Sequence, residues 1–162
     1  MVSGIGPGSY RLYVGATNLD GWWPRSALRG DTDLFDTDIL VDGSTELSGV
    51  AVTMSERRTT LSGSLQTPAG VPVTDVFVIA FPTDRRHWGP RSRRVQAVRP
   101  ASDGRFTIAG LPAGEYRLAA VTDADPDEWQ DPAFLALAVA TAIPVSLAEG
   151  ETKTQDLQLA GQ

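Results

Sequence analysis

The sequence predicts an all-β protein, a seven-stranded β-sandwich with a short helix in one connection, preceded by three strands of a second, similar unit. Short apolar segments separated by turns at intervals of about eight to twelve residues run from residue 59 to residue 159, which is typical of a sandwich. The 16 glycines and 11 prolines supply the turns. Residues 4–12 also align without a gap on residues 110–118, with five identities, which indicates an internal repeat.

The first two strands of the complete unit differ in the spacing of their apolar side chains. Residues 59–66 alternate, with Leu61, Gly63 and Leu65 on one face, as in a half-buried strand. Residues 76–81 are apolar at every position, which predicts a central strand covered on both faces, and Pro82 ends it. Five further strands are expected at residues 94–99, 106–108, 116–120, 143–147 and 157–159.

Two connections have recognisable local chemistry. Asp103-Gly104 predicts a tight hairpin turn over residues 102–105, because glycine tolerates the positive φ that such turns need. Residues 131–138 predict the short helix, since Asp131 can cap it, Pro132 suits its first turn and good helix formers follow.

The N-terminal unit, residues 1–55, contains fewer candidate strands than the complete unit, residues 59–160. Strands are expected at residues 10–14, 38–41 and 47–54, as counterparts of the last three strands of the complete unit. The matches pair Tyr10 with Tyr116, Ile39 with Ile143, and residues 52–54 with 157–159. They place Trp22-Trp23 where the complete unit has Trp129, in the long connection between the strands at residues 116–120 and 143–147. Three strands with one apolar face are marginally stable. Four further upstream strands, the second domain or another chain would have to cover that face.

Composition and residue types exclude several classes of function. A net charge of −6 argues against nucleic acid as a partner, and no apolar run is long enough to insert into a membrane. There is no cysteine for a disulfide or a thiolate metal site, and no signal peptide begins at Met1. His87 is the only histidine and no Gly-x-Ser-x-Gly segment occurs, so neither an enzyme nor a bound cofactor is expected.

Four segments in order, residues 61–65, 68–73, 103–106 and 110–118, resemble the carboxypeptidase regulatory-like domain. The resemblance covers residues 59–159, with residues 4–54 as a partial second copy. It implies a Greek-key, transthyretin-like sandwich of the carbohydrate-binding-like class. Such domains accompany metallocarboxypeptidases and occur in many exported bacterial proteins as accessory modules without catalytic residues. The resemblance therefore implies a periplasmic, cell-surface or extracellular location.

The repeated segment has a structural explanation. Gly110 and Gly114 permit a tight turn, Pro112 preorganises it, and Tyr116 is expected to bury its ring while its hydroxyl bonds to the backbone, as in the tyrosine corners of other sandwiches. The corresponding residues of the first copy are Gly8 and Tyr10.

A basic loop at residues 84–94 is the first candidate binding site. Its arginines and tryptophan could stack on a sugar or hold an anionic polymer, could pair with the acidic loop of a neighbouring copy, or could form a solvated hairpin tip. Trp129 could likewise contact a sugar or cover the end of the core. The candidate ligand-binding or partner-binding residues are Arg85, Arg86, His87, Trp88, Arg91 and Trp129.

An acidic loop at residues 123–131 is the second candidate site. Its carboxylates alternate as in calcium loops, but the sixth position is not glycine and the twelfth is Phe134, which excludes an EF-hand. The alternative is a solvated loop in which Asp131 caps the helix. The candidate ligands for a weak calcium ion are Asp123, Asp125, Asp127 and Asp131, with a looser echo at Asp31, Asp33, Asp36 and Asp38.

These observations lead to one predicted function and one alternative. The chain is predicted to be a non-catalytic structural or interaction module of a larger exported bacterial protein, with neighbouring domains of that protein or other copies of itself as partners. The alternative is a carbohydrate-binding accessory module that holds a glycan with loop tryptophan and arginine side chains.

Overall fold

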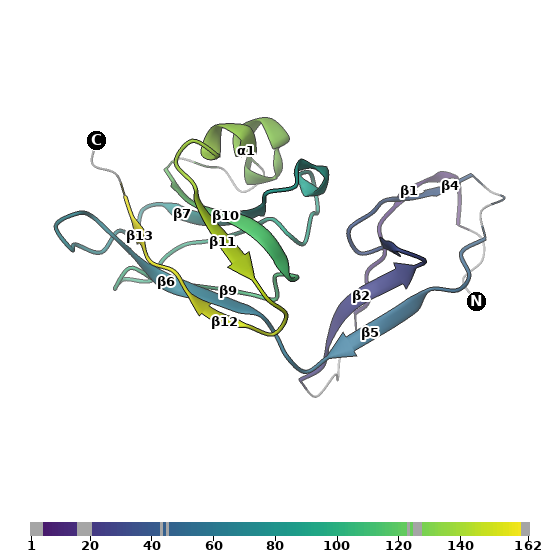
Figure 1. Ribbon diagram of the computed structural model, residues 1–162. Helices are drawn as coiled ribbons and strands as arrows, with labels where there is room; N and C mark the ends of the chain where they lie inside the picture. The colour runs from purple at the N-terminus through teal and green to yellow at the C-terminus, as the bar shows by residue number, and fades with distance from the viewer. Residues whose placement is uncertain are drawn as a thin grey trace. The chain divides into compact units, whose positions relative to one another are not determined.

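The computed structural model describes residues 5–15, 21–42, 44, 46–122, 124 and 128–159. The fold is all-β with one α-helix, as predicted, and it divides into two compact units, Met1–Glu56 and Arg57–Gln162 (Figure 1). Within the described part of the chain, no helix has the length and apolar character needed to cross a bilayer.

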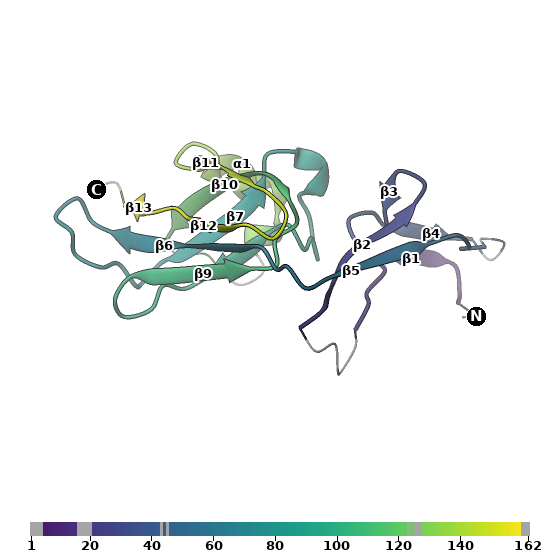
Figure 2. The same ribbon diagram turned by 60° about the horizontal axis from the view of Figure 1, so that its bottom comes forward.

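The second unit is a sandwich of two sheets. One sheet has the antiparallel order β11-β10-β7-β8, from strands Ile143–Leu147, Gly114–Val121, Phe77–Pro82 and Gln96–Val98. In the other sheet, β6 (Thr60–Gln66) pairs antiparallel with β9 (Arg105–Ala109) and parallel with β12 (Thr152–Thr154) and β13 (Leu157–Gln158). Figure 2 shows β9 along one edge of β6 and β12 and β13 along the other. Because β12 and β13 pair one after the other with the same edge of β6, they form one interrupted last strand.

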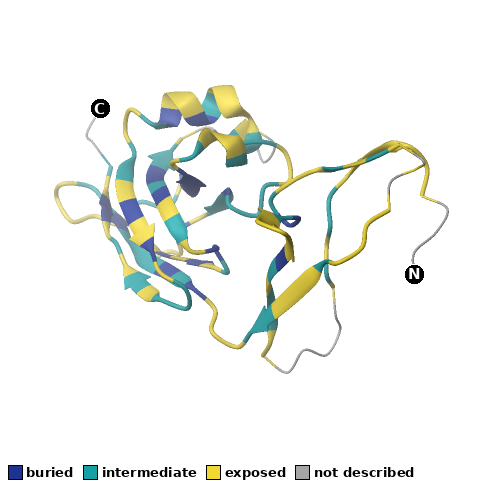
Figure 3. Ribbon diagram, turned by 45° about the vertical axis from the view of Figure 1, so that its right-hand side comes forward, coloured by how far each residue is buried: buried dark blue, intermediate teal, exposed yellow. Residues whose placement is uncertain are grey.

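The main core lies between the two sheets, because alternate side chains of each strand point to the same face. Leu61 and Leu65 of β6 are fully buried against residues of the other sheet, Val78 of β7 and Leu118 of β10. The solvent side of β6 and β9 is polar. Figure 3 shows bands of buried and exposed residues along strands of this unit.

The sheet containing β7 has a second apolar face, covered by helical segments. Ile79 and Phe81 of β7 are fully buried there, packed in one cluster with Leu135 and Ala138 of α1 (Pro132–Ala138). The prediction of a central strand that is apolar on both faces is therefore confirmed. The predicted helix is also present, and the Asp131 carboxylate accepts a hydrogen bond of 2.8 Å from the backbone N–H of Ala133 at its start.

The predicted hairpin at residues 102–105 is wrong in its pairing. A tight turn is present, with Gly104 at φ +79° and its N–H donating to the carbonyl of Ala101 at 2.8 Å. The turn joins β8 to β9, however, and these strands belong to different sheets. The local chemistry specified the turn, whereas the pairing depends on which neighbour each strand meets across the sandwich.

The described part of the first unit contains five short strands in two sheets. β1 (Gly8–Tyr10) pairs with β4 (Ile39–Val41), and β2 (Trp23–Arg29) pairs with both β3 (Thr32–Asp33) and β5 (Ala51–Ser55). Among its described residues, only three apolar side chains are buried, those of Ala27, Leu34 and Phe35. This unit is therefore weakly packed by itself.

Three details of the first unit differ from the sequence prediction. The strand expected at residues 10–14 lies at Gly8–Tyr10, and Trp23 begins β2 rather than lying in an open connection. The last strand, β5, pairs antiparallel with β2, whereas its expected counterparts β12 and β13 run parallel to β6. The difference arises because no described strand of the first unit takes the place of β6, so β5 pairs with the neighbour that is present.

The paired strands around the repeated segment have the same register in both units. Tyr10 lies opposite Ile39 and Tyr116 lies opposite Val145, so Ile39 corresponds to Val145 rather than to Ile143. The Tyr116 hydroxyl donates to the Pro112 carbonyl at 2.7 Å, and the Tyr10 hydroxyl donates to the Gly6 carbonyl at 3.0 Å, each four residues upstream. Tyr116 is 1% exposed but Tyr10 is 39% exposed, so the shared turn is buried only in the second unit.

Candidate functional site

The basic loop joins β7 to β8 and is built on a single helical turn. Arg85–His87 form this 3-10 turn, η1, and Asp84 caps it by accepting a hydrogen bond of 3.0 Å from the backbone N–H of Arg86. Aspartate is favoured at such a position because its carboxylate satisfies an N–H that the turn leaves unpaired. The cap therefore fixes where the loop leaves the end of β7.

Asp84 and Arg86 form a close ion pair in the loop. The Arg86 Nη2 atom lies 2.6 Å from Asp84 Oδ2, and Nε lies 3.0 Å from the same oxygen. The hydrogen bonds from the Arg86 side chain, followed by the one from its backbone N–H, lower the pKa of Asp84 from 3.8 to about 2. His87 Nε2 is 4.0 Å from Asp84 Oδ2. These contacts place the side chains of Arg86 and His87 beside the carboxylate of Asp84.

The low pKa of Asp84 predicts a measurable pH dependence. A carboxyl group whose folded pKa is depressed stabilises the fold above its unfolded pKa, and this contribution disappears as the pH falls from about 3.8 towards 2. Carbon-13 NMR titration of the Asp84 carboxyl group should give a pKa near 2 in the native chain and a value closer to 3.8 in an Arg86→Ala variant. A native pKa near 3.8 would show that the pair does not form in solution.

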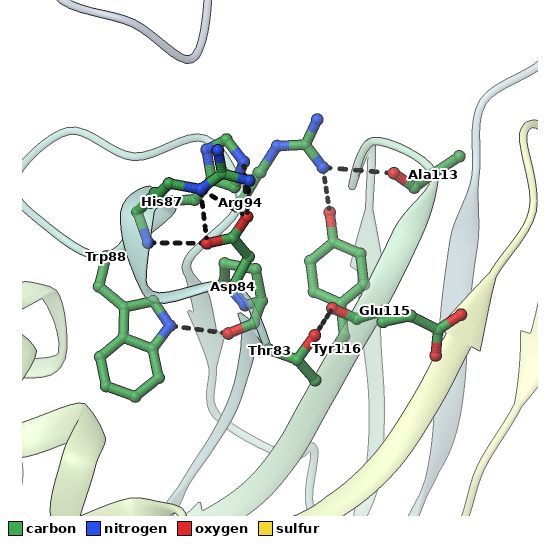
Figure 4. Close-up of polar contacts among 10 residues, drawn as sticks. Thr83, Asp84, His87, Trp88, Arg94, Ala113, Glu115 and Tyr116 are labelled. Atoms are coloured by element: carbon green, nitrogen blue, oxygen red, sulfur yellow. Dashed lines mark hydrogen bonds and ion pairs between the residues drawn. The ribbon is translucent and has the colours of Figure 1, made fainter.

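Trp88 is held by the fold rather than presented to solvent. Its indole N–H donates to the Pro82 carbonyl at 2.7 Å (Figure 4). Its ring meets Phe81 edge-on, with 5.7 Å between the ring centroids. The Arg85 guanidinium lies over the indole, 5.1 Å from the ring centroid. A sugar stacking on that side of Trp88 would therefore have to displace Arg85.

The far end of the loop is tied to two other parts of the second unit. The Arg91 N–H donates to the side chain of Gln130 at 2.8 Å, which connects the loop to the 3-10 turn η2 (Glu128–Gln130). Arg94 donates to the carbonyl of Ala113 at 3.2 Å and to the hydroxyl of Tyr116 at 3.4 Å (Figure 4). The sequence predicted neither the contacts of Arg94 nor that of Gln130, because contacts between residues far apart in the chain leave no local pattern.

Trp129 belongs to the same apolar layer as Trp88. Its ring lies 4.9 Å from that of Phe77, and both tryptophans pack on the outer face of the β7 sheet. The structure thus brings the six predicted binding residues onto two linked elements, the basic loop and η2. Of the two tryptophans in the first unit, Trp22 is exposed, and Trp23, at the start of β2, is half-buried.

The acidic loop is described only in part. Asp123, Asp125 and Asp127 lie outside the described residues, so the proposed calcium ligands cannot be placed beyond Asp131. The Asp131 carboxylate caps α1. In the described ranges, no group of three or more histidine, aspartate or glutamate side chains is arranged to hold a metal ion.

Comparison with known proteins gives similarity to solved structures only. No protein-family model matches the sequence, and no curated protein matches it. A streptococcal ancillary pilin aligns over 86% of this chain and 44% of its own, with 12% identity and a TM-score of 0.46. The major pilin subunit of Bacillus cereus aligns over 68% and 34%, with 8% identity and a TM-score of 0.41. The chain spans less than half of either pilin.

A third similar structure comes from a protein of a different kind. It is the dioxygenase domain of a dioxygenase carbohydrate-binding protein fusion from the cellulolytic bacterium Streptomyces sp. SirexAA-E. The alignment covers 64% of this chain and 79% of that domain, with 20% identity and a TM-score of 0.37.

Proposed function

We propose that the chain is a non-catalytic structural and interaction module of a larger exported bacterial protein, related to carboxypeptidase regulatory-like domains, and that its first unit makes the contact. The observation that carries this proposal is the distribution of exposed apolar side chains. Eight of the ten large exposed apolar residues in the described part of the chain lie between residues 5 and 52. Tyr13 is 87% exposed and Leu40 is 75% exposed. Such a concentration on one small unit favours an interaction surface.

The free edge of β1 supplies the backbone for such a contact. In the second unit, β10 lies between β11 and β7, whereas the described strands place only β4 beside β1. Since the β1–β4 register matches the β10–β11 register, one edge of β1 corresponds to the place of β7, and none of the described strands pairs with that edge. An exposed strand edge carries unpaired N–H and C=O groups and readily accepts another strand.

Charge favours another copy of the same chain as the partner. Residues 1–56 contain eight acidic side chains and three arginines, a net charge of −5, whereas residues 84–94 contain five arginines and one aspartate. This basic loop leads directly into β8, an edge strand that pairs only with β7 among the described strands. Addition of β1 from one copy to β8 of another would join two free edges of three residues each, between surfaces of opposite charge. The two surfaces differ, so such a contact is head-to-tail.

Sedimentation velocity tests this function. The native chain is expected to form dimers and larger species between about 10 and 300 µM, and a Tyr13→Ser, Leu40→Ser, Val52→Ser variant is expected to remain monomeric, because it loses exposed apolar contact area. Raising the salt from 50 to 500 mM should also weaken assembly, since exposed charges are then screened.

The matched control replaces the two exposed apolar residues of the second unit. A Val71→Ser, Leu137→Ser variant removes large exposed apolar side chains from the second unit alone and should assemble like the native chain. A native chain that is monomeric at 300 µM would contradict self-association. Equal loss in both variants would show that the first unit is not the contact surface.

A further inference from the structure

We infer that the solvent face of the β9-β6-β12 sheet contains a binding site for a neutral saccharide. A hollow of about 450 Å³ opens there, within the size range of small-ligand sites. Its side chains are six polar residues of three adjacent segments, with Gly63 and Phe106 beneath them: Ser62, Ser64, Arg105, Thr107, Thr154 and Asp156. This site is separate from the basic loop, and the inference does not depend on the self-association proposed above.

Strand register arranges these side chains in two rows. Ser62 pairs with Thr107 on one side and with Thr154 on the other, so three hydroxyl groups cross the sheet in a line. Because neighbouring strands lie about 4.8 Å apart, the hydroxyls repeat at roughly that distance. A hydroxyl both donates and accepts hydrogen bonds, which suits the hydroxyls of a sugar.

The second row carries one positive and one negative group. Ser64 pairs with Arg105, and the Asp156 carboxylate accepts hydrogen bonds from the N–H and the hydroxyl of Ser64 at 2.7 and 2.9 Å. These bonds use only the Oδ1 atom of Asp156 and hold the carboxylate at the rim. The residues that line the hollow include one positive side chain, Arg105, and one negative side chain, Asp156. Arg105 also lies 3.6 Å from Asp103, which does not line the hollow and offsets part of the arginine charge. The hollow therefore has no surplus positive charge, which favours a neutral polyhydroxyl ligand over an anion.

The hollow exists because the last strand is interrupted. Asp156 takes over the hydrogen bond that a strand carbonyl would make to the Ser64 N–H, so the ladder stops between β12 and β13. Gly63 lets the Gln155 carbonyl approach β6 at this point, where any side chain would meet it. The break thus turns a flat polar sheet face into a concave surface.

NMR titration of the nitrogen-15-labelled chain tests this site. The probes are glucose, N-acetylglucosamine and their β-1,4-linked tetrasaccharides at up to about 50 mM. At least one of them should shift the amide signals of residues 62–64, 105–107 and 154–156 in a saturable manner. Thr107→Val keeps a β-branched strand residue but removes the hydroxyl at one end of the row, and it should weaken binding about tenfold. Asp156→Asn keeps an acceptor for Ser64 and should weaken binding to a similar extent.

Thr152→Val is the matched control, because Thr152 is an exposed threonine of the same strand that does not line the hollow. It should bind like the native chain. Shifts confined to residues 85–93 and the Trp88 indole would contradict this site and would indicate that the saccharide binds to the basic loop. The absence of shifts with all four probes would contradict saccharide binding altogether. Neither result alters the sedimentation experiment, so failure of the saccharide site is distinguishable from failure of self-association.

Discussion

Replacing Tyr116 by alanine is expected to lower the free energy of unfolding of the second unit by about 3–5 kcal/mol. The ring is 1% exposed and lies in the core between the sheets, while the hydroxyl donates to Pro112 at 2.7 Å and accepts from Arg94 at 3.4 Å. The loss combines a cavity with two broken polar contacts. Since domains of this size are stable by about 5–15 kcal/mol, the variant should be close to unfolding at 37 °C.

A pair of phenylalanine variants isolates the hydroxyl group. Tyr116→Phe should cost about 1 kcal/mol or more, because it leaves the buried Pro112 carbonyl without its donor. Tyr10→Phe removes the same bond from an exposed ring, where water replaces the hydroxyl, and should cost less than about 0.5 kcal/mol. Urea denaturation followed by tryptophan fluorescence measures all three variants. Equal losses from the two phenylalanine variants would contradict the difference in burial.

Substituting Gly63 by alanine is expected to be the second strongly destabilising change. A Cβ atom at this position would collide with the Gln155 carbonyl oxygen and lie 2.7 Å from its carbon and 2.9 Å from the Phe106 ring. Backbone atoms cannot move aside as a flexible side chain can, so β12 and β13 must shift from β6. We expect a loss of about 3 kcal/mol, at the upper end of the range for overpacking.

Thermal unfolding provides the measurement for Gly63→Ala. A loss of this size corresponds to a fall in Tm of more than about 10 °C for a unit of this length. Gly6→Ala is the control, because no atom lies within 4 Å of the position that its Cβ would occupy and its φ is not positive. An unchanged Tm for Gly63→Ala would show that the last strand does not approach β6 as described.

Much of the second unit could be predicted from local sequence signals. The doubly apolar segment identified β7 as a central strand, and Asp131-Pro132 marked the start of α1. The pairing of strands was harder to predict from the sequence, because it depends on contacts between distant residues. The turn at Asp103-Gly104 was recognised, but nothing local to it indicates that β8 and β9 lie in different sheets.

Contacts between distant residues were even harder to predict from the sequence in the first unit and in the candidate site. β5 pairs with β2 because the neighbour expected from the repeat is not among the described strands, and no sequence pattern indicates that choice. In the basic loop, the sequence identified the arginines and Trp88 but not their contacts. The bonds from Trp88 to Pro82 and from Arg91 to Gln130 depend on the folded path of the chain. The hollow beside Gly63 was missed for the same reason, since its side chains come from three separate segments.

Hydrogen exchange at two protein concentrations tests most directly whether the first unit joins one copy to another through a free strand edge. If β1 adds to β8 of another copy, the amides of residues 8–10 and 96–98 should exchange more slowly at 300 µM than at 5 µM, while those of β6 exchange at the same rate. Identical exchange of residues 8–10 at both concentrations would contradict this account.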